Sequence, residues 1–172
     1  MTKTTRILAL PLAALGLAAL SLVTAQGASA ASGHQLRVLS SGKCLDVPGW
    51  SKSWGTPVDQ WSCVNQANEN WIIYRAKTVH LEPLYEIKNV NSGLCLNIKD
   101  ASKRRGAAVI QWPCDKSADN ELFYKTIQAN DSAIWTNRNS KLCLNVAGNS
   151  KANGARLTQW TCNGSFNEIF KY

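Results

Sequence analysis

The sequence predicts an all-β protein made of three repeats, and two observations carry that prediction. One segment occurs three times: it opens with Cys-Leu and then Asp or Asn, and it closes with Gln-Trp, one further residue and a second cysteine. These segments are 44–63, 95–114 and 143–162, so nineteen positions separate the two cysteines in each. In addition, no window keeps the apolar period of a helix, whereas short β-branched and aromatic stretches alternate with Gly, Asn and Ser.

The N-terminus is typical of a secretory signal peptide, which we expect over residues 1–30. Lys3 and Arg6 precede an apolar stretch at 7–25, and small residues up to Ala30 suggest a cleavage site. A retained membrane anchor is the alternative, because the apolar stretch is nearly long enough to span a bilayer, although it contains a proline and a glycine. We expect cleavage, secretion to the extracellular space, and no membrane association afterwards.

Residues 31–172 remain after cleavage and are expected to form a single domain. This part contains all six cysteines, and an even number in an exported chain indicates disulfides rather than metal sites. Six cysteines permit 15 pairings. Pairing within each segment is the simplest, because equal spacing then uses one local geometry three times. Each such bridge closes a loop of about 20 residues and stabilises the fold by about 3 kcal/mol. The expected pairs are Cys44 with Cys63, Cys95 with Cys114, and Cys143 with Cys162.

Twelve short strands are expected, four in each repeat. Each is a β-branched or aromatic stretch bounded by turn-forming residues. The repeats cover about 34–78, 79–128 and 129–172. The strands are 35–39, 45–47, 58–61 and 71–74; then 85–90, 96–98, 109–112 and 122–125; then 133–137, 144–146, 157–160 and 169–172.

The third strand of each repeat assigns two faces, since successive side chains point to opposite sides. In the first repeat, Val58 and Gln60 share one face, and Asp59 and Trp61 share the other. The apolar residue must face the core, so the tryptophan faces outward and the glutamine inward as a structural amide. The same alternation places Val109, Gln111, Leu157 and Gln159 inside and Trp112 and Trp160 outside.

Each repeat ends with Asn-Glu, one further residue and an aromatic, at 68–71, 120–123 and 167–170. We expect the aromatics in the core, because a threefold repeat must bury one large side chain per unit. Strands at both chain ends suggest a closed barrel, which leaves no free sheet edge.

Residues 34–172 resemble the ricin B-type lectins, a family also found as carbohydrate-binding modules of secreted glycoside hydrolases. The matching features are Cys-Leu-Asx-Val/Ile, the second cysteine, the aromatic two positions before it, and the closing Asn-Glu-x-aromatic, where the family usually has Gln-x-Trp. The resemblance implies a β-trefoil fold and a carbohydrate-binding function, with a glycan or polysaccharide as partner.

In sugar-binding members of that family, each repeat carries one shallow pocket. The positions in the first repeat are Asp46, Asp59, Trp61, Asn68 and Glu69. A carboxylate accepts hydrogen bonds from two sugar hydroxyls, an amide both donates and accepts, and the aromatic face receives the C–H side of the pyranose. Since a charged acceptor makes stronger hydrogen bonds than a neutral one, the first repeat is expected to bind best. Three carboxylates near one tryptophan also suggest an amino sugar or another cationic ligand as a hypothesis.

The second and third repeats depart further from the family pattern and are weaker candidates. Asn97 and Asn145 replace the acid, and Ile110 and Thr158 replace the polar residue before the aromatic. Turn-capping is the alternative role for Asp46 and its two asparagine counterparts. The weaker candidate residues are Asn97, Trp112, Asn120, Asn145, Trp160 and Asn167.

Other features leave alternatives open. Trp50 and Trp54 either extend the first sugar platform or pack over the disulfide, because the other two repeats lack aromatics there. The basic run at 103–105 is interpreted as a solvated loop. His34 and His80 match no catalytic or metal-binding spacing and are expected at the surface.

The formal net charge of +8 falls to +6 once the two signal-peptide cations are removed. Basicity favours anionic surfaces. The cations are nevertheless spread and no nucleic-acid-binding motif occurs, so we expect no nucleic acid partner. The sequence therefore predicts a secreted, monomeric, non-catalytic lectin-like protein without cofactor or metal. A glycosidase using the carboxylates of the first repeat is disfavoured, because catalysis needs a cleft. A protein-binding trefoil with degenerate sugar sites, such as an inhibitor or adhesion protein, is the main alternative.

Overall fold

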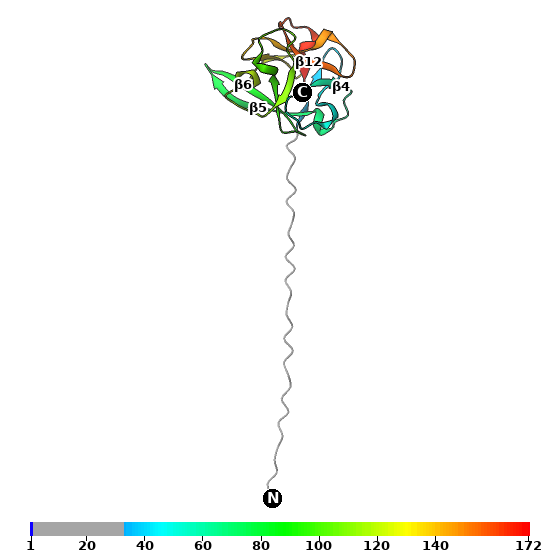
Figure 1. Ribbon diagram of the computed structural model, residues 1–172, viewed down its shortest axis with the longest axis vertical. Coiled ribbons are helices and arrows are strands. Elements are labelled where there is room, and N and C mark those ends of the chain that lie inside the picture. The colour runs from blue at the N-terminus through cyan, green and yellow to red at the C-terminus, as the bar shows by residue number, and fades with distance from the viewer. Residues whose placement is uncertain (2–32) are drawn as a thin grey trace.

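The computed structural model describes Met1 and residues 33–172, and the described part is an all-β domain (Figure 1). Six single-turn 3₁₀ helices, two in each repeat, lie between the strands. The strands are β1 His34–Gln35, β2 Arg37–Val38, β3 Cys44–Asp46, β4 Asp59–Trp61, β5 Asn70–Val79, β6 Glu82–Asn89, β7 Cys95–Ile98, β8 Val109–Trp112, β9 Phe123–Gln128, β10 Ser132–Asn137, β11 Cys143–Val146, β12 Ala155–Trp160 and β13 Ile169–Lys171. The 3₁₀ helices are η1 Pro48–Trp50, η2 Ala67–Glu69, η3 Lys99–Ala101, η4 Asp119–Glu121, η5 Ala147–Asn149 and η6 Phe166–Glu168.

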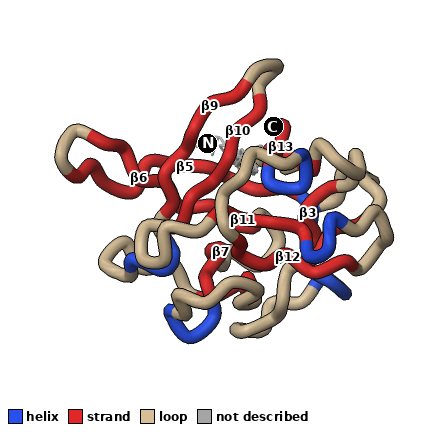
Figure 2. The backbone as a smooth tube through the Cα atoms, turned by 90° about the horizontal axis from the view of Figure 1, so that it is seen from above, coloured by secondary structure: helices blue, strands red, loops and turns tan. Residues whose placement is uncertain are grey.

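The twelve expected strands all appear, and the first is divided into β1 and β2. The largest difference lies in β5, which continues to Val79 and pairs with β6 as a long hairpin. The β5–β6 and β9–β10 hairpins project from the body of the domain (Figure 2). The expected signal peptide lies outside the described residues, as does the expected domain start at residue 31.

One sheet joins the two ends of the described chain. The last strand, β13, pairs with β2 near the start and also with β10. Three shorter hairpins, β3–β4, β7–β8 and β11–β12, repeat one register, in which the first cysteine lies opposite the tryptophan: Cys44 opposite Trp61, Cys95 opposite Trp112, and Cys143 opposite Trp160. This threefold arrangement confirms the β-trefoil architecture.

The core receives one large aromatic from the end of each repeat, as expected. Trp71, Phe123 and Phe170 are fully buried, and they pack among apolar side chains from all three repeats. Because Trp71 is larger and polar at its ring nitrogen, it also needs a hydrogen-bond partner in the core. Its Nε1 donates to the Leu45 carbonyl at 3.0 Å.

The three disulfides pair as expected within each repeat: Cys44–Cys63, Cys95–Cys114 and Cys143–Cys162. In each repeat the first cysteine is buried on the first strand of a short hairpin, and the second lies just beyond the second strand. Each bridge therefore closes the hairpin that carries the exposed tryptophan.

Three buried glutamines bind each hairpin to a loop of another repeat. We call these loops, 51–55, 102–106 and 150–154, the bordering loops. Gln60 Nε2 donates to the carbonyls of Ser150 and Ala152, each at 2.9 Å. The two other glutamines do the same with the remaining loops: Gln111 with Ser51 and Ser53, and Gln159 with Ser102 and Arg104. Each repeat thus holds the bordering loop of the repeat before it, in a closed cycle of three.

Candidate functional site

Each repeat places an Asx side chain on the first strand of its hairpin and a tryptophan on the second. The Asx residues are at most 7% exposed, whereas the tryptophans are 47%, 41% and 43% exposed in Trp61, Trp112 and Trp160. The outward orientation of the tryptophans is confirmed. Each repeat therefore offers an aromatic face beside a recessed polar group.

Asp46, Trp50, Trp61, Asn68 and Glu69 line a pocket of about 370 Å³ in the first repeat. Asn68 Nδ2 donates to Asp46 Oδ1 and, at 3.3 Å, to the backbone carbonyl after it. Asn68 Oδ1 is buried without a hydrogen-bond partner among the described residues. The structure thus brings four of the five expected residues to one pocket, with one buried amide oxygen left unpaired.

Glu69 also lines this pocket, although its side chain is only 1% exposed. Its Oε2 accepts from the backbone N–H groups of Val64 and Asn65 at 2.8 and 3.0 Å, and from Gln35 Nε2 at 3.2 Å. The carboxylate therefore fixes the loop after the second cysteine, a structural task that sequence reasoning did not assign to it.

Asp59 is the fifth expected residue, and it lies behind the pocket rather than in its lining. It is 4% exposed, lies opposite Asp46 in the β3–β4 register, and has Arg156 Nη1 of β12 at 3.9 Å. Burial raises the pKa of Asp59 to about 6, and the Arg156 charge opposes that rise. Asp59 is thus recessed, and its charge helps to raise the pKa of its neighbour Asp46.

The Asp46 carboxyl is the most perturbed group in the pocket. Burial raises its pKa to about 7, the charges of Asp59 and Glu69 add to that rise, and the Asn68 hydrogen bond opposes it. Two carboxyls, at positions 46 and 69, thus line one pocket in the first repeat.

The second and third repeats resolve that conflict with an amide. Asn97 Nδ2 donates to Glu121 Oε1 at 2.7 Å, and Asn145 Nδ2 donates to Glu168 Oε1 at 3.4 Å. The family pattern has an acid after Cys-Leu and an amide in the closing motif, whereas these repeats have an asparagine first and a glutamate second. Asn97 and Asn145 therefore match the glutamates that they contact, and they are not merely lost acids. The asparagine and the glutamate of each repeat can be read from the sequence, but only the structure shows that the two side chains are hydrogen-bonded.

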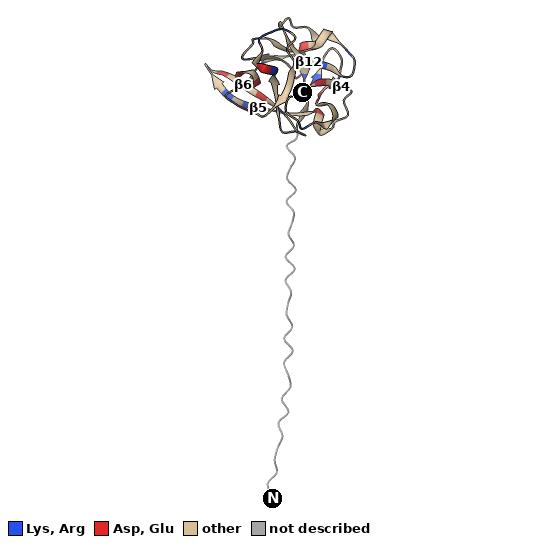
Figure 3. Cartoon of the chain, viewed as in Figure 1, with Lys and Arg blue, Asp and Glu red and all other residues tan. Residues whose placement is uncertain are grey.

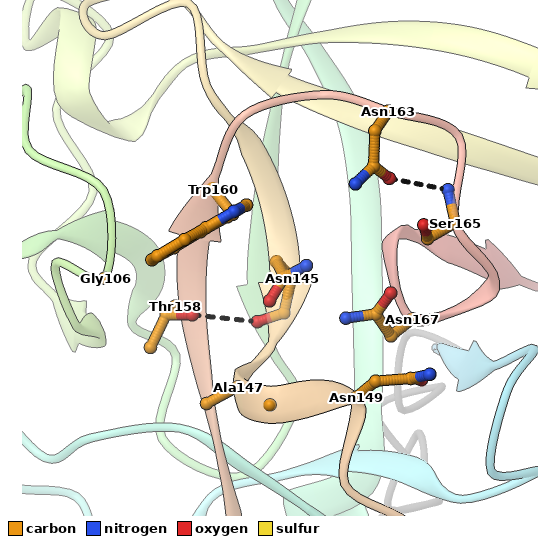
Figure 4. Close-up of a pocket in the computed structure, with 10 residues that line it drawn as sticks. Gly106, Asn145, Ala147, Asn149, Thr158, Trp160, Asn163, Ser165 and Asn167 are labelled. Atoms are coloured by element: carbon orange, nitrogen blue, oxygen red, sulfur yellow. Dashed lines mark hydrogen bonds between the residues drawn. The ribbon is translucent and has the colours of Figure 1, made fainter.

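The third repeat carries the larger pocket, of about 470 Å³ (Figure 4). Trp160 forms one wall, with Thr158 and Asn145 beside it and Asn167 opposite. Thr158 Oγ1 donates to the Asn145 carbonyl at 3.3 Å, and Asn167 Nδ2 donates to the Val146 carbonyl at 3.0 Å. No carboxylate from the described part of the chain lines this pocket.

The second repeat is bordered by an aromatic from the first. Trp54 lies against Trp112, with ring centroids 5.6 Å apart and planes inclined by 57°. Trp50 instead lines the first pocket. Trp50 and Trp54, which are close in the sequence, therefore contact two different repeats. Ile110, which precedes Trp112 by two residues, is buried.

Residues 33–172 contain no group of three or more His, Cys, Asp or Glu side chains placed to hold a metal ion. No helix in this described part is long and apolar enough to cross a membrane.

Comparison with known proteins gives a consistent result. The family model described as "Ricin-type beta-trefoil lectin domain-like" matches residues 22–84 and 78–160. A probable lipoprotein, EnvE, of Salmonella typhimurium is 31% identical over 84 residues, which are 49% of this chain and 43% of that protein. The chain therefore spans less than half the length of this curated relative.

Two solved structures resemble the domain closely. The designed threefold-symmetric protein ThreeFoil has a TM-score of 0.73 and 28% identity, covering 80% of this chain and 94% of ThreeFoil. The exo-β-1,3-galactanase 1,3Gal43A of Clostridium thermocellum has a TM-score of 0.76 and 25% identity, covering 82% of this chain but 30% of the galactanase.

Proposed function

This chain belongs to the family of ricin-type β-trefoil lectin-like domains, and from that premise we propose that it is an exported, non-catalytic carbohydrate-binding protein. The observation that carries the proposal is the first-repeat pocket, where the half-exposed ring of Trp61 stands beside the recessed polar groups of Asp46 and Asn68.

The chemistry of this pocket suits a neutral pyranose. The C–H face of the sugar stacks on Trp61, while Asp46 accepts hydrogen bonds from two adjacent hydroxyls. Asn68 holds the Asp46 carboxyl in place through its side-chain N–H. Glu69 and Asp59 act from behind, the first by fixing the loop and the second by raising the proton affinity of Asp46. An amino sugar is a second ligand class, because its ammonium would neutralise the carboxyl pair.

Binding at one shallow pocket of this kind is expected to be about millimolar, or about −4 kcal/mol. The three exposed tryptophans lie on one domain, so a repetitive polysaccharide gains affinity by engaging several of them at once. Trp112 with Asn97 and Asn120, and Trp160 with Asn145 and Asn167, supply the second and third contacts.

A non-catalytic function fits the carboxyls of the first repeat. A glycosidase needs one protonated and one ionised carboxyl on opposite sides of the scissile bond. Asp46 and Asp59 are instead direct cross-strand neighbours, and Glu69 is engaged by three donors. Export is supported by the three disulfides, since such bridges persist in oxidising compartments.

The protein-binding alternative depended on the substitutions at Asn97, Ile110 and Asn145. The hydrogen bonds of Asn97 to Glu121 and of Asn145 to Glu168 give both asparagines a fitted place in their hairpins, and Ile110 is buried. Carbohydrate binding therefore remains the better proposal.

Trp61→Ala and Asp46→Ala, made together, test the function. Binding to a panel of immobilised neutral polysaccharides should fall at least tenfold, with the melting temperature retained. Phe166→Ala is the matched control, because it removes an aromatic that is 65% exposed and lies outside the first pocket. No binding by the wild-type protein at millimolar sugar, or an equal loss in the Phe166→Ala variant, would contradict the proposal.

A further inference from the structure

The third pocket is built from two repeats, because the bordering loop of the second repeat contributes to its lining. Gly106, at the end of the second-repeat loop, donates its N–H to the Gln159 carbonyl at 2.8 Å, and Gly106 is part of the third pocket. Its φ of +75° suits glycine, and a Cβ there would lie 3.7 Å from the Trp160 ring. Figure 4 shows Gly106 beside the edge of that ring. The wall of the third pocket next to its tryptophan therefore comes from the second repeat.

The three bordering loops differ in chemistry. The first brings Trp54 to Trp112. The third ends at Gly154, where a Cβ would lie 3.9 Å from the Trp61 ring, and it carries a single cation, Lys151. The second contains Lys103, Arg104 and Arg105 in succession. Elsewhere in the domain, Lys and Arg are spread over many elements (Figure 3). The longest run of cations in the described domain thus lies in the loop that contributes Gly106 to the third pocket.

This basic loop is exposed but held in place at its backbone. Gln159 Nε2 donates to the carbonyls of Ser102 and Arg104 at 2.8 and 2.9 Å, and the Arg104 N–H donates to Ser102 Oγ at 3.2 Å. Within residues 33–172, no ion pair engages Lys103, Arg104 or Arg105. The cations are therefore presented on a fixed backbone and are free for a ligand.

The described residues that line the third pocket carry no charge that would oppose an anion. Its polar lining consists of asparagines, one serine and Thr158. The Glu168 carboxylate below is fully buried, with its oxygens accepting from Asn145 and from two backbone N–H groups. Asp100, at the start of the basic loop, is the one acid in segment 99–106, which also holds four cations. The first pocket, lined by Asp46 and Glu69, is unfavourable for an anion.

We propose that the third pocket is a subsite for an acidic sugar residue, one bearing a carboxylate or a sulfate ester. The pyranose ring stacks on Trp160, while the anionic group is received by Arg104 and Arg105 from the neighbouring repeat. Guanidinium groups suit this task, because their donors match the paired oxygens of a carboxylate or sulfate. The inference rests on the proposed carbohydrate-binding function and gives it a substrate class: a polysaccharide with both neutral and acidic residues.

The test compares three immobilised probes: an oligogalacturonate, a sulfated galactan and an uncharged galactan. Arg104→Ala with Arg105→Ala should weaken binding to at least one acidic probe about tenfold. Lys52→Ala with Arg75→Ala is the matched control, since it removes the same charge from exposed positions that do not line the third pocket and should leave that binding within about twofold. Trp160→Ala should abolish the preference for the acidic probe without affecting the neutral one at the first pocket.

Equal losses in the two double variants would show diffuse attraction and overturn the proposal. So would retention of acidic binding by the Trp160→Ala variant, or binding of single-stranded DNA with the same dependence on Arg104 and Arg105. If the wild-type protein binds the neutral galactan with no acidic preference, only this inference fails. Binding to none of the three probes overturns this inference, and the proposed function fails with it only if the panel of neutral polysaccharides is not bound either.

Discussion

Replacement of Asp46 by Asn should stabilise the fold at alkaline pH while weakening sugar binding. In the wild-type protein Asp46 and Glu69 are buried acids that line one pocket, and the Glu69 charge helps to raise the pKa of Asp46. The substitution recreates the Asn–Glu pair of the other repeats, where Asn97 donates to Glu121 at 2.7 Å. It therefore removes a like-charge contact and supplies a hydrogen bond in one step.

The magnitude follows from the pKa of Asp46, which burial and the two neighbouring acids raise from 3.8 to about 7. At about 1.4 kcal/mol per pKa unit, the ionised carboxylate costs the folded state up to about 4 kcal/mol above pH 7. Water entering through the pocket reduces that penalty, so we expect a gain of about 2 kcal/mol at pH 8.

The sign of the pH dependence is fixed by the direction of this shift. Because the folded protein holds the Asp46 proton more tightly than the unfolded chain, its stability falls as pH rises from about 4 to about 7, and it levels off above that. The difference in unfolding free energy between the Asp46→Asn variant and the wild type should grow over the same interval. Asp59 and Glu121, whose pKa values are also raised, are present in both proteins.

Urea unfolding at one-unit steps from pH 4 to 9 measures this difference. Asp100→Asn, the same chemical change at an exposed acid of η3, is the control and should shift stability by less than about 0.5 kcal/mol. A variant that is less stable than the wild type at pH 8, or a difference that does not change with pH, would refute the reasoning.

Three further outcomes are expected. The affinity of the first pocket for a neutral sugar should rise as the pH increases through about 7, because the Asp46 carboxyl then ionises and becomes a stronger acceptor. Titration calorimetry at pH 5.5 and 8.5 measures this rise, and equal affinities would show that Asp46 makes no ligand contact. Replacing Cys95 and Cys114 with Ala should lower stability by about 3 kcal/mol in denaturant unfolding, and a loss below about 1 kcal/mol would contradict the loop-closure argument. Trp71→Phe should lower the stability measured by thermal unfolding by about 1–3 kcal/mol, because it removes the hydrogen bond to the Leu45 carbonyl and leaves a void in the core. An unchanged melting temperature would show instead that the core repacks around the smaller ring.

The sequence was sufficient for the architecture because the trefoil is specified by local signals repeated three times. Register and disulfide pairing follow from Cys-Leu-Asx and from the position of the tryptophan, and the inward glutamines follow from strand alternation. The length of β5 was underestimated, since its outer half, Arg75 to Val79, is held by pairing with β6 rather than by a buried apolar face.

The candidate sites were less predictable, because their chemistry depends on contacts between repeats. Sequence reasoning assigned Trp54 to its own repeat, whereas the ring lies against Trp112. It grouped Asp59 with the ligand-facing residues, although that carboxyl lies behind the pocket. The glycine conformations and the glutamine hydrogen bonds bring each bordering loop to the tryptophan of the next repeat. These contacts join residues far apart in the sequence, so they could be identified only in the folded structure.

The glutamine cycle also affects how such a domain can change. The loop that borders a tryptophan belongs to the preceding repeat, so under the proposed function the unit of sugar recognition is offset from the sequence repeat. Substitutions in segment 102–106 would then alter recognition at Trp160 while leaving the hairpin of their own repeat unchanged. Loop substitutions alone would let the repeats differ in ligand preference, and a grafted loop would transfer specificity to the next repeat rather than to the repeat that receives it.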